Sequence, residues 1–141
     1  LISQDQYAGA TVDSALEKSE SVLDRFGSEV DGIFCPNESS TQGMLQALMA
    51  KGLAGDIQFV GFDAAPKLVQ ALRDETLHGL VVQNPFRMGY EGVQTAAKIL
   101  RGETVPERID TGVTMVTRDN MDEEAVQALL NPPIDQYLGA P

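Results

Sequence analysis

Short apolar runs alternate with amphipathic stretches along most of this chain, and that order constrains the fold more than any other feature. Apolar runs of strand length occupy residues 32–35, 57–62 and 79–83. Segments with apolar residues on one helical face begin at Thr11, at the serine pair Ser39–Ser40 and at Pro66. Neighbouring parallel strands need a crossover helix between them. The order therefore predicts an α/β fold, with a parallel sheet flanked by helices on both faces.

Further elements are predicted downstream of these runs. A helix is expected over residues 86–101, and Ile109–Thr117 alternates between apolar and polar residues as a half-buried or edge strand does. Asn120 and Glu123 have the spacing of a capping box, which predicts the start of a last helix. The proline-rich tail from Asn131 is expected to be irregular.

Composition argues against several classes of function. Ten basic and twenty-one acidic residues give a net charge of −11, which disfavours nucleic acid and anionic membranes as partners. No apolar run approaches the roughly 20 residues of a membrane-spanning helix. A single cysteine, Cys35, and a single histidine, His78, lie far apart in the sequence, so no catalytic triad and no His/Cys metal site are evident. Phosphate-binding and dinucleotide-binding glycine motifs are missing as well. We therefore expect no enzyme, no metal and no cofactor.

A polar side chain follows each of the three apolar runs: Asn37, Asp63 and Gln83. If the strands are parallel, their carboxyl ends share one edge of the sheet, where open α/β folds bind ligands. A carboxylate accepts hydrogen bonds from adjacent hydroxyls, while an amide both donates and accepts, so the three residues suit a polyol or sugar.

Two alternatives compete with a ligand site. Asn and Asp are favoured at helix N-termini, so these residues could simply cap the helices that follow. An Asp-based hydrolase or phosphotransfer receiver domain also uses an aspartate at a strand end. Such a domain would need a second carboxylate and a lysine nearby, whereas the neighbouring strand ends here carry amides.

Three stretches of the sequence resemble sugar-type periplasmic substrate-binding proteins of ABC importers, the family of ribose-binding protein. They are DGIFCPNESSTQGMLQAL, VGFDAAPKLVQALRDETLHGLVVQNPFRMGYEGVQTAAKILRGE and DTGVTMVTRDNMDE, which together cover most of residues 31–124. The fixed order of a strand-end Asn, a GFD motif and a strand-end Gln followed by proline and glycine carries the resemblance. It implies one lobe of a type I periplasmic-binding-protein fold.

The resemblance also implies which residues contact a ligand. Asn37, Asp63 and Gln83 match positions at which the family hydrogen-bonds its sugar, and Phe62 would line the pocket. Tyr7 lies near the place where the family offers an aromatic ring to a sugar face. The implied protein is an extracytoplasmic or periplasmic receptor that delivers a sugar to an ABC permease.

Relative to that family, the chain corresponds to a fragment. Residues 1–141 would form a single α/β lobe, and the chain lacks a first lobe and the opening strand of the second; the apolar Leu1–Ser3 is expected to be the end of a strand. In the intact family the helix over residues 86–101 belongs to the other lobe. Here it must fold onto its own lobe, pair with a second copy or project freely. Affinity for a sugar should be poor, because half of the binding groups and the hinge are missing.

Two other classes of protein share this fold. One is the effector-sensing domain of a lactose-repressor-type transcription regulator, which would carry a helix-turn-helix upstream. The other is the sensing domain of a membrane receptor or kinase. The segments VVQNPFRMGYEGV and TGVTMVTRDNMDE resemble transport receptors more than regulators.

Overall fold

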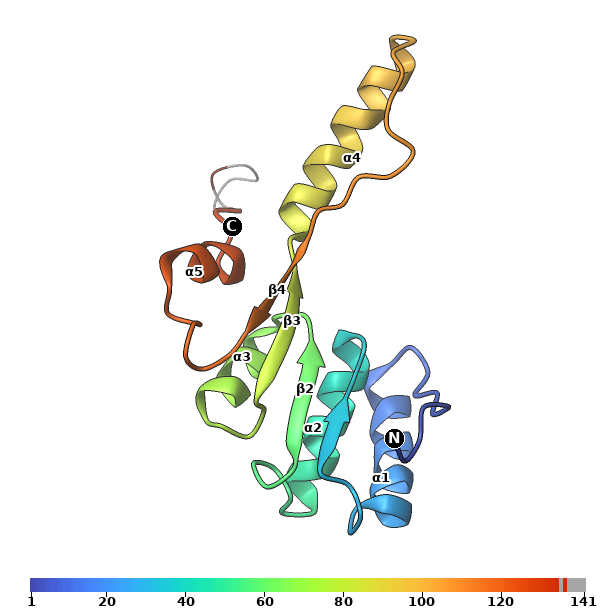
Figure 1. Cartoon of the computed structure of the whole chain (residues 1–141), viewed down its shortest axis with the longest axis vertical. Coiled ribbons are helices and arrows are strands. Elements are labelled where there is room, and N and C mark those ends of the chain that lie inside the picture. Colours follow the sequence, from blue (N-terminus) through green and yellow to red (C-terminus); the bar gives the residue numbers. More distant parts are fainter. Residues whose placement is uncertain (135, 137–141) are drawn as a thin grey trace.

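The computed structural model describes residues 1–134 and 136, so most of the predicted irregular tail lies outside the described residues. Helices and strands alternate along the chain as the sequence predicts (Figure 1). In order, the elements are α1 Val12–Phe26, β1 Gly32–Phe34, α2 Glu38–Ala50, β2 Gln58–Phe62, α3 Pro66–Arg73, β3 Gly79–Gln83, α4 Pro85–Leu100, β4 Val113–Val116 and α5 Glu124–Leu130.

The four strands form one sheet in the order β1-β2-β3-β4. β1, β2 and β3 are parallel, which confirms the prediction for the three apolar runs. β4 differs, because it pairs antiparallel with β3, with Gln83 opposite Val113 and Leu80 opposite Val116. It is also shorter than the predicted Ile109–Thr117 strand: Gly112, directly before it, has a φ of +74°, which is outside the extended conformation of a strand.

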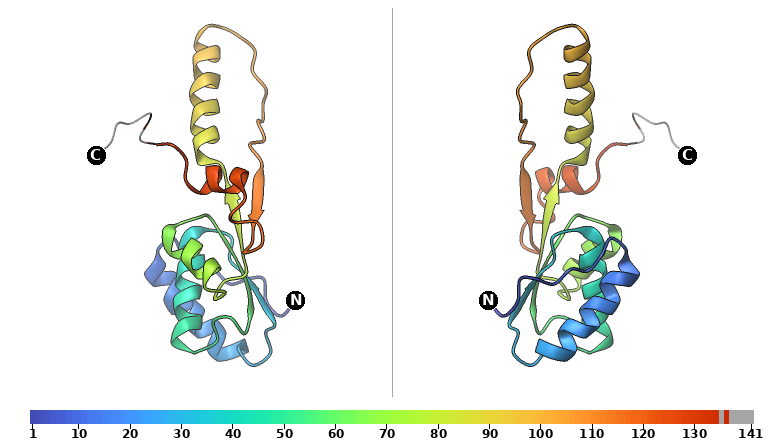
Figure 2. Two further views of the ribbon diagram at one scale, coloured as in Figure 1. Left: turned by 90° about the vertical axis from the view of Figure 1, so that its left-hand side faces the viewer. Right: turned by 90° about the vertical axis from the view of Figure 1, so that its right-hand side faces the viewer.

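Helices α1, α2 and α3 lie on one side of the sheet (Figure 2). This arrangement follows from the strand order: two right-handed crossovers that advance in the same direction put both connecting helices on the same face. The prediction of helices on both faces is therefore wrong for these elements. Phe59 and Leu80 point toward the helices and are fully buried, whereas Phe34 on the opposite face is 58% exposed.

The core fills the space between the sheet and this helical layer. Its largest fully buried side chains come from several elements and include Phe59, Leu48, Leu68, Leu72 and Leu80. Each apolar side chain of this size contributes about 1.5–3 kcal/mol when it leaves water. The packed layer therefore holds the carboxyl ends of β1, β2 and β3 in a fixed arrangement.

Helix α4 leaves this layer and projects away from the sheet (Figure 1). None of its 16 residues, all within the described part of the chain, is buried. Apolar side chains stand exposed along it: Tyr90 is 59% exposed, Val93 70% and Leu100 88%. The helix therefore does not fold onto its own lobe, and within the single chain it projects, with its apolar side chains uncovered.

Two local predictions fail. Leu1–Ser3 forms no strand, and Leu1 is fully exposed. Asn120 does not cap α5: its Oδ1 accepts from the backbone N–H of Thr117 and its Nδ2 donates to the carbonyl of Met115, which closes the turn after β4. Helix α5 begins after Glu123 without a side-chain cap.

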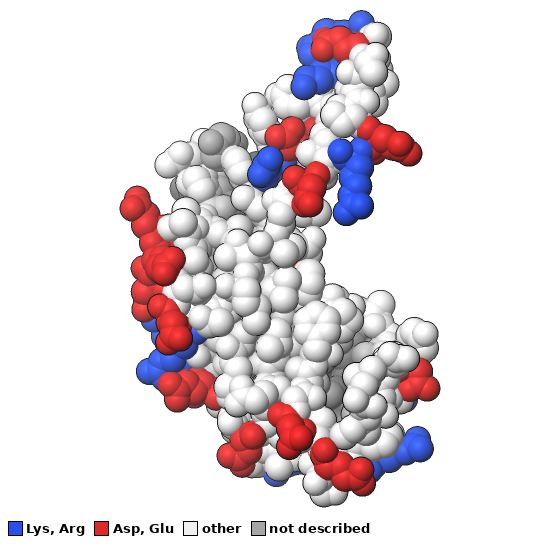
Figure 3. Space-filling model, in the orientation of Figure 1, with Lys and Arg blue, Asp and Glu red and all other residues white. Residues whose placement is uncertain are grey.

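Charged side chains are spread over the face seen in Figure 3 rather than gathered at one point. Figure 3 shows acidic residues scattered along one side, and a concave, weakly charged region between the projecting part and the α1 side. The carboxyl ends of β1 and β2 point toward that concave side in the same orientation (Figure 1). Among the described residues, no helix is long and apolar enough to cross a membrane.

Candidate ligand-binding site

The three predicted polar residues lie at the same edge of the sheet. Asn37 follows β1, Asp63 follows β2 and Gln83 ends β3, and these strands run parallel. Gln83 Nε2 donates a hydrogen bond to Asp63 Oδ1 at 3.3 Å, and both side chains are half-buried. Asn37 is exposed. The edge therefore holds one carboxylate and two amides, with the carboxylate paired to one of the amides.

Asp63 has an unusual backbone conformation. Its φ is +67°, a left-handed value that only a few per cent of non-glycine residues adopt, with Asp and Asn among the more tolerant. Such a conformation costs on the order of 1 kcal/mol and persists where the surroundings hold it. Here the Asp63 N–H donates to the carbonyl of Val81 at 2.9 Å, and the side chain accepts from Gln83. The backbone and the side chain of Asp63 are therefore both held by β3.

The side-chain amide of Asn37 caps a helix through its oxygen and, within the residues that the structure describes, leaves its nitrogen free. Its Oδ1 accepts from the Ser40 backbone N–H at 2.9 Å and from Ser39 Oγ at 3.1 Å, so it is the N-cap of α2. The capping alternative is thus correct for this residue, and the serine pair lies inside the helix. Among the described residues, the Asn37 Nδ2 has no hydrogen-bond partner, so its two N–H groups can still donate to a ligand.

The two aromatic candidates differ in their surroundings. Phe62 is half-buried at the end of β2, beside Val81 of β3 and directly before Asp63. Tyr7 is 87% exposed on the segment before α1 and makes no hydrogen bond within the described part of the chain. Phe62 is therefore adjacent to the strand-end residues, while the Tyr7 ring is open to solvent.

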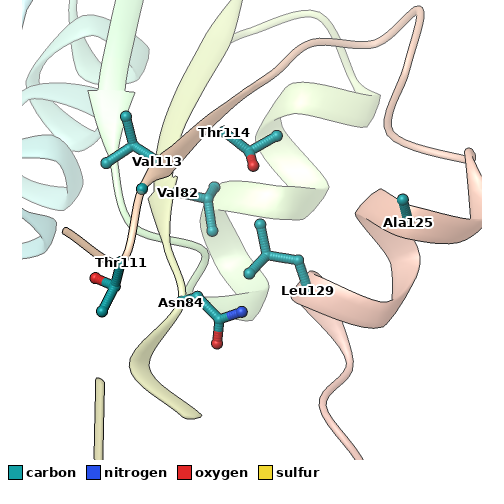
Figure 4. A pocket seen from close by; sticks show the side chains of 8 residues that line it. Val82, Asn84, Thr111, Val113, Thr114, Ala125 and Leu129 are labelled. Carbon is teal, nitrogen blue, oxygen red and sulfur yellow. The ribbon is translucent and has the colours of Figure 1, made fainter. Parts of the chain in front are cut away.

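An open hollow of about 200 Å³ lies close to this edge but belongs to another surface (Figure 4). Val82 of β3 points into it, and its side chain lies on the opposite face of the sheet from that of Gln83. None of the five predicted contact residues lines it. The lining residues are Val82, Asn84, Thr111, Gly112, Val113, Thr114, Ala125 and Leu129.

Metal-ion chemistry finds no support within the described residues. No group of three or more His, Cys, Asp or Glu side chains there is arranged to hold a metal ion.

Burial raises the pKa of the Cys35 thiol to about 12, against a weaker opposing effect of a hydrogen bond with Ser40. The thiol is thus neutral near pH 7 and unsuited to act as a nucleophile.

Sequence reasoning missed one buried residue beside the site. Thr41, fully buried in the first turn of α2, donates from Oγ1 to the carbonyl of Asn37 at 2.7 Å and accepts from the N–H of Phe62 at 2.9 Å. The first bond was foreseeable, since a threonine in a helix often bonds the carbonyl four residues before it. The second was not, because it joins residues 21 positions apart.

Curated relatives of this chain are binding proteins. The ribose import binding protein RbsB of Escherichia coli is 33% identical over 90 residues, which are 64% of this chain and 30% of that protein. The xylitol-binding protein of Mycolicibacterium smegmatis is 28% identical over 110 residues, 78% of this chain and 31% of that protein. The chain thus spans about a third of the length of these relatives.

Solved structures show the same fold. A solute-binding protein of an ABC transporter from Agrobacterium vitis, with bound D-fucose, matches with a TM-score of 0.85 and 35% identity, over 91% of this chain and 44% of that chain. A carbohydrate transporter solute-binding protein from Agrobacterium radiobacter, in complex with D-arabinose, matches with a TM-score of 0.82 and 34% identity. The match covers 89% of this chain and 42% of that chain. The sequence model described as "Periplasmic binding protein domain" matches residues 1–104. This chain therefore belongs to the periplasmic binding protein family, and its fold is that of one lobe of a type I member.

Proposed function

We propose that this chain is the sugar-binding lobe of a solute receptor for ABC-type import, and that Asn37, Asp63 and Gln83 hydrogen-bond the sugar. The observation that carries the proposal is the bond between Gln83 and Asp63 at the shared carboxyl edge of parallel strands. The two neighbouring solute-binding proteins, one with bound D-fucose and one in complex with D-arabinose, support it.

The hydrogen-bonding capacity left at this edge suits hydroxyl groups. Asp63 Oδ2 and Gln83 Oε1 can accept, and the Asn37 Nδ2 can donate. A sugar hydroxyl donates one hydrogen bond and accepts others, so adjacent hydroxyls match such a mixture. Carboxamide groups do not ionise near neutral pH, so the edge has a single ionisable group, a carboxylate, which favours binding over acid–base catalysis. Phe62 supplies an apolar surface beside the carboxylate, and the exposed ring of Tyr7 is a further aromatic contact in this proposal.

The whole receptor extends beyond this lobe in our proposal. The chain covers 44% or less of the two solved neighbours, and α4 exposes an apolar surface that fits a second lobe. The sugar would be enclosed between two lobes, and the closed form presented to a membrane permease in the periplasm. The names of the curated relatives favour this transport role over the transcription-regulator and membrane-sensor alternatives.

Titration by nuclear magnetic resonance tests the proposal on the chain itself, because it detects the weak binding expected of a single lobe. Amide signals of the ¹⁵N-labelled chain would be followed during addition of D-ribose, D-arabinose, D-fucose and xylitol. We expect saturable shifts at Asn37, Asp63 and Gln83, and loss of these shifts in Asp63→Asn. The matched control is Asp56→Asn, which removes an exposed carboxylate in the loop before β2.

Two results would overturn the proposal. One is a titration in which none of the sugars moves the strand-end signals up to the highest concentration used. The other is an Asp63→Asn chain that binds as well as the unaltered chain, which would remove Asp63 as a ligand contact.

A further inference from the structure

We propose that Thr41 is a positioning residue of this site: its buried hydroxyl ties the strand-end residue Asn37 to the segment Phe62–Asp63. The expected effect on sugar binding rests on the proposed function. The structural role rests only on the hydrogen bonds that Thr41 makes. The hydroxyl donates to the Asn37 carbonyl at 2.7 Å and accepts from the Phe62 N–H at 2.9 Å. Thr41 has no exposed surface, so water does not reach its hydroxyl in the folded chain.

The Phe62 N–H needs this acceptor because β1 ends too early to supply one. The last hydrogen bond between the two strands on that edge runs from the Cys35 N–H to the Val60 carbonyl, at 3.0 Å. Farther along β2 the next donor on the same edge is Phe62, and its acceptor in a continued ladder would be the carbonyl of Cys35, but β1 ends at Phe34 and the Phe62 N–H bonds Thr41 Oγ1 instead. A buried N–H without an acceptor costs about 1–3 kcal/mol. The Thr41 hydroxyl thus takes the place of the Cys35 carbonyl as the acceptor for the Phe62 N–H.

Gly61 makes this approach possible. A Cβ added at Gly61 would lie 2.1 Å from Thr41 Cγ2 and 2.9 Å from Thr41 Oγ1. Both distances are far inside van der Waals contact, so any other residue at position 61 would push α2 away from the end of β2. The absence of a side chain at Gly61 lets the threonine rest on the strand backbone.

The two hydrogen bonds form a short connection between two proposed sugar contacts. Asn37 begins α2 one turn before Thr41, and Asp63 directly follows Phe62. On its other side Asp63 is held by Val81 and Gln83 of β3. Thr41 therefore fixes the spacing between contacts on β1 and β2, while β3 fixes the spacing between contacts on β2 and β3.

A matched pair of substitutions separates the hydroxyl from the shape of the side chain. Thr41→Val keeps the branched shape and removes both hydrogen bonds, whereas Thr41→Ser keeps the hydroxyl and removes the methyl group. The control for loss of a half-buried hydroxyl elsewhere is Thr76→Val, whose Oγ1 bonds the Ala71 carbonyl. All variants would be compared well below their unfolding temperatures.

Without any sugar, Thr41→Val should accelerate amide hydrogen exchange at Phe62 and shift the amide signals of Asn37 and Asp63. With the sugar that binds the unaltered chain most tightly, it should weaken affinity by about 3- to 10-fold, because the two lost hydrogen bonds position the contacts without touching the sugar, so the effect should be about that of one lost contact. Thr41→Ser should stay within about twofold of the unaltered chain, and Thr76→Val should leave the strand-end signals and the affinity unchanged.

The positioning role is wrong if Thr41→Val moves the strand-end signals no more than Thr76→Val does, or if the valine and serine variants weaken binding equally. If Thr41→Val fails to fold, Thr41→Ala removes the same hydroxyl, and the exchange rate of the Phe62 amide in the unaltered chain is an independent readout. Exchange as fast as that of an exposed loop amide would overturn the proposal. A chain that binds no sugar would refute the proposed function, while the measurements without sugar would still decide the role of Thr41.

Discussion

Gln83 Nε2 donates to Asp63 Oδ1, so the side chains that end two neighbouring parallel strands are bonded to each other at 3.3 Å. The bond holds the carboxylate of a residue whose backbone is in the left-handed region. It also uses only one of the two amide N–H groups and one of the two carboxylate oxygens. The pair is therefore arranged in advance and still has capacity for further hydrogen bonds, as a preformed binding site requires.

Gln83→Glu should weaken the fold at neutral pH, because it replaces this bond by two facing carboxylates. For half-buried groups in contact, we expect a loss of about 1 kcal/mol in the free energy of unfolding. Thermal unfolding at pH 7 measures the effect, with Gln58→Glu as a control that adds the same charge at the exposed start of β2. Equal losses in both variants would contradict the specific contact.

Gly61→Ala should destabilise the fold by about 2–3 kcal/mol, because the new Cβ would overlap Thr41 in a packed region. Gly92→Ala is the matched control: nothing lies within 4 Å of a Cβ there, and alanine favours a helix over glycine by roughly 0.5–1 kcal/mol. Chemical denaturation would measure both. Combining Gly61→Ala with Thr41→Ser should recover part of the loss, since the serine lacks the nearest atom. A Gly61→Ala chain as stable as the control would mean that α2 adjusts at no cost.

The sequence was sufficient for those features that depend on residues close together in the chain. Apolar runs followed by polar residues correctly predicted the three parallel strands. They also predicted that Asn37, Asp63 and Gln83 lie at one edge of the sheet. The family resemblance and the fold class are confirmed by the matching family model and by solved structures. What could not be predicted depends on partners distant in sequence. The bond from Phe62 to Thr41 is an example, because neither residue type nor spacing indicates it.

The failed local predictions have a similar cause. Asn120 has the right spacing to cap a helix, but its amide bonds the backbone at Met115 and Thr117, and such local bonds compete with capping. Alternation of apolar and polar residues identified β4 as a strand without revealing its direction. The coverage of only one face by helices depends on the strand order, which periodicity does not contain.

Cys35 should make stability depend on pH above 9. Burial raises the pKa of its thiol to about 12, from a value of 9.0 for an unperturbed cysteine. Between these values the unfolded chain loses the proton and the folded chain keeps it, so the free energy of unfolding falls as pH rises from about 9 toward 12. The slope approaches about 1.4 kcal/mol per pH unit. Denaturation at pH 8 and pH 10 measures it.

The control for this prediction is Cys35→Ala, which has no thiol to titrate. Its stability should be lower than that of the unaltered chain at pH 8, because a buried side chain is shortened. The gap between the two chains should narrow at pH 10. A constant gap would mean that the thiol does not remain protonated in the folded chain.

Helix α4 should contribute little to the stability of the isolated chain, although it is the longest helix described. Val93→Lys places a charge on a side chain that is 70% exposed, so the free energy of unfolding should change by less than about 0.5 kcal/mol. The matched core substitution, Leu72→Ala, should cost about 2–5 kcal/mol, because Leu72 is almost fully buried. Chemical denaturation of both variants at low concentration makes the comparison.

Light scattering over a range of concentrations would then show whether copies of the chain associate through α4. If they do, Val93→Lys should abolish the association. If the association persists in this variant, another surface is responsible. A large loss of stability in monomeric Val93→Lys would contradict the projecting position of the helix and indicate that it packs on the sheet in solution.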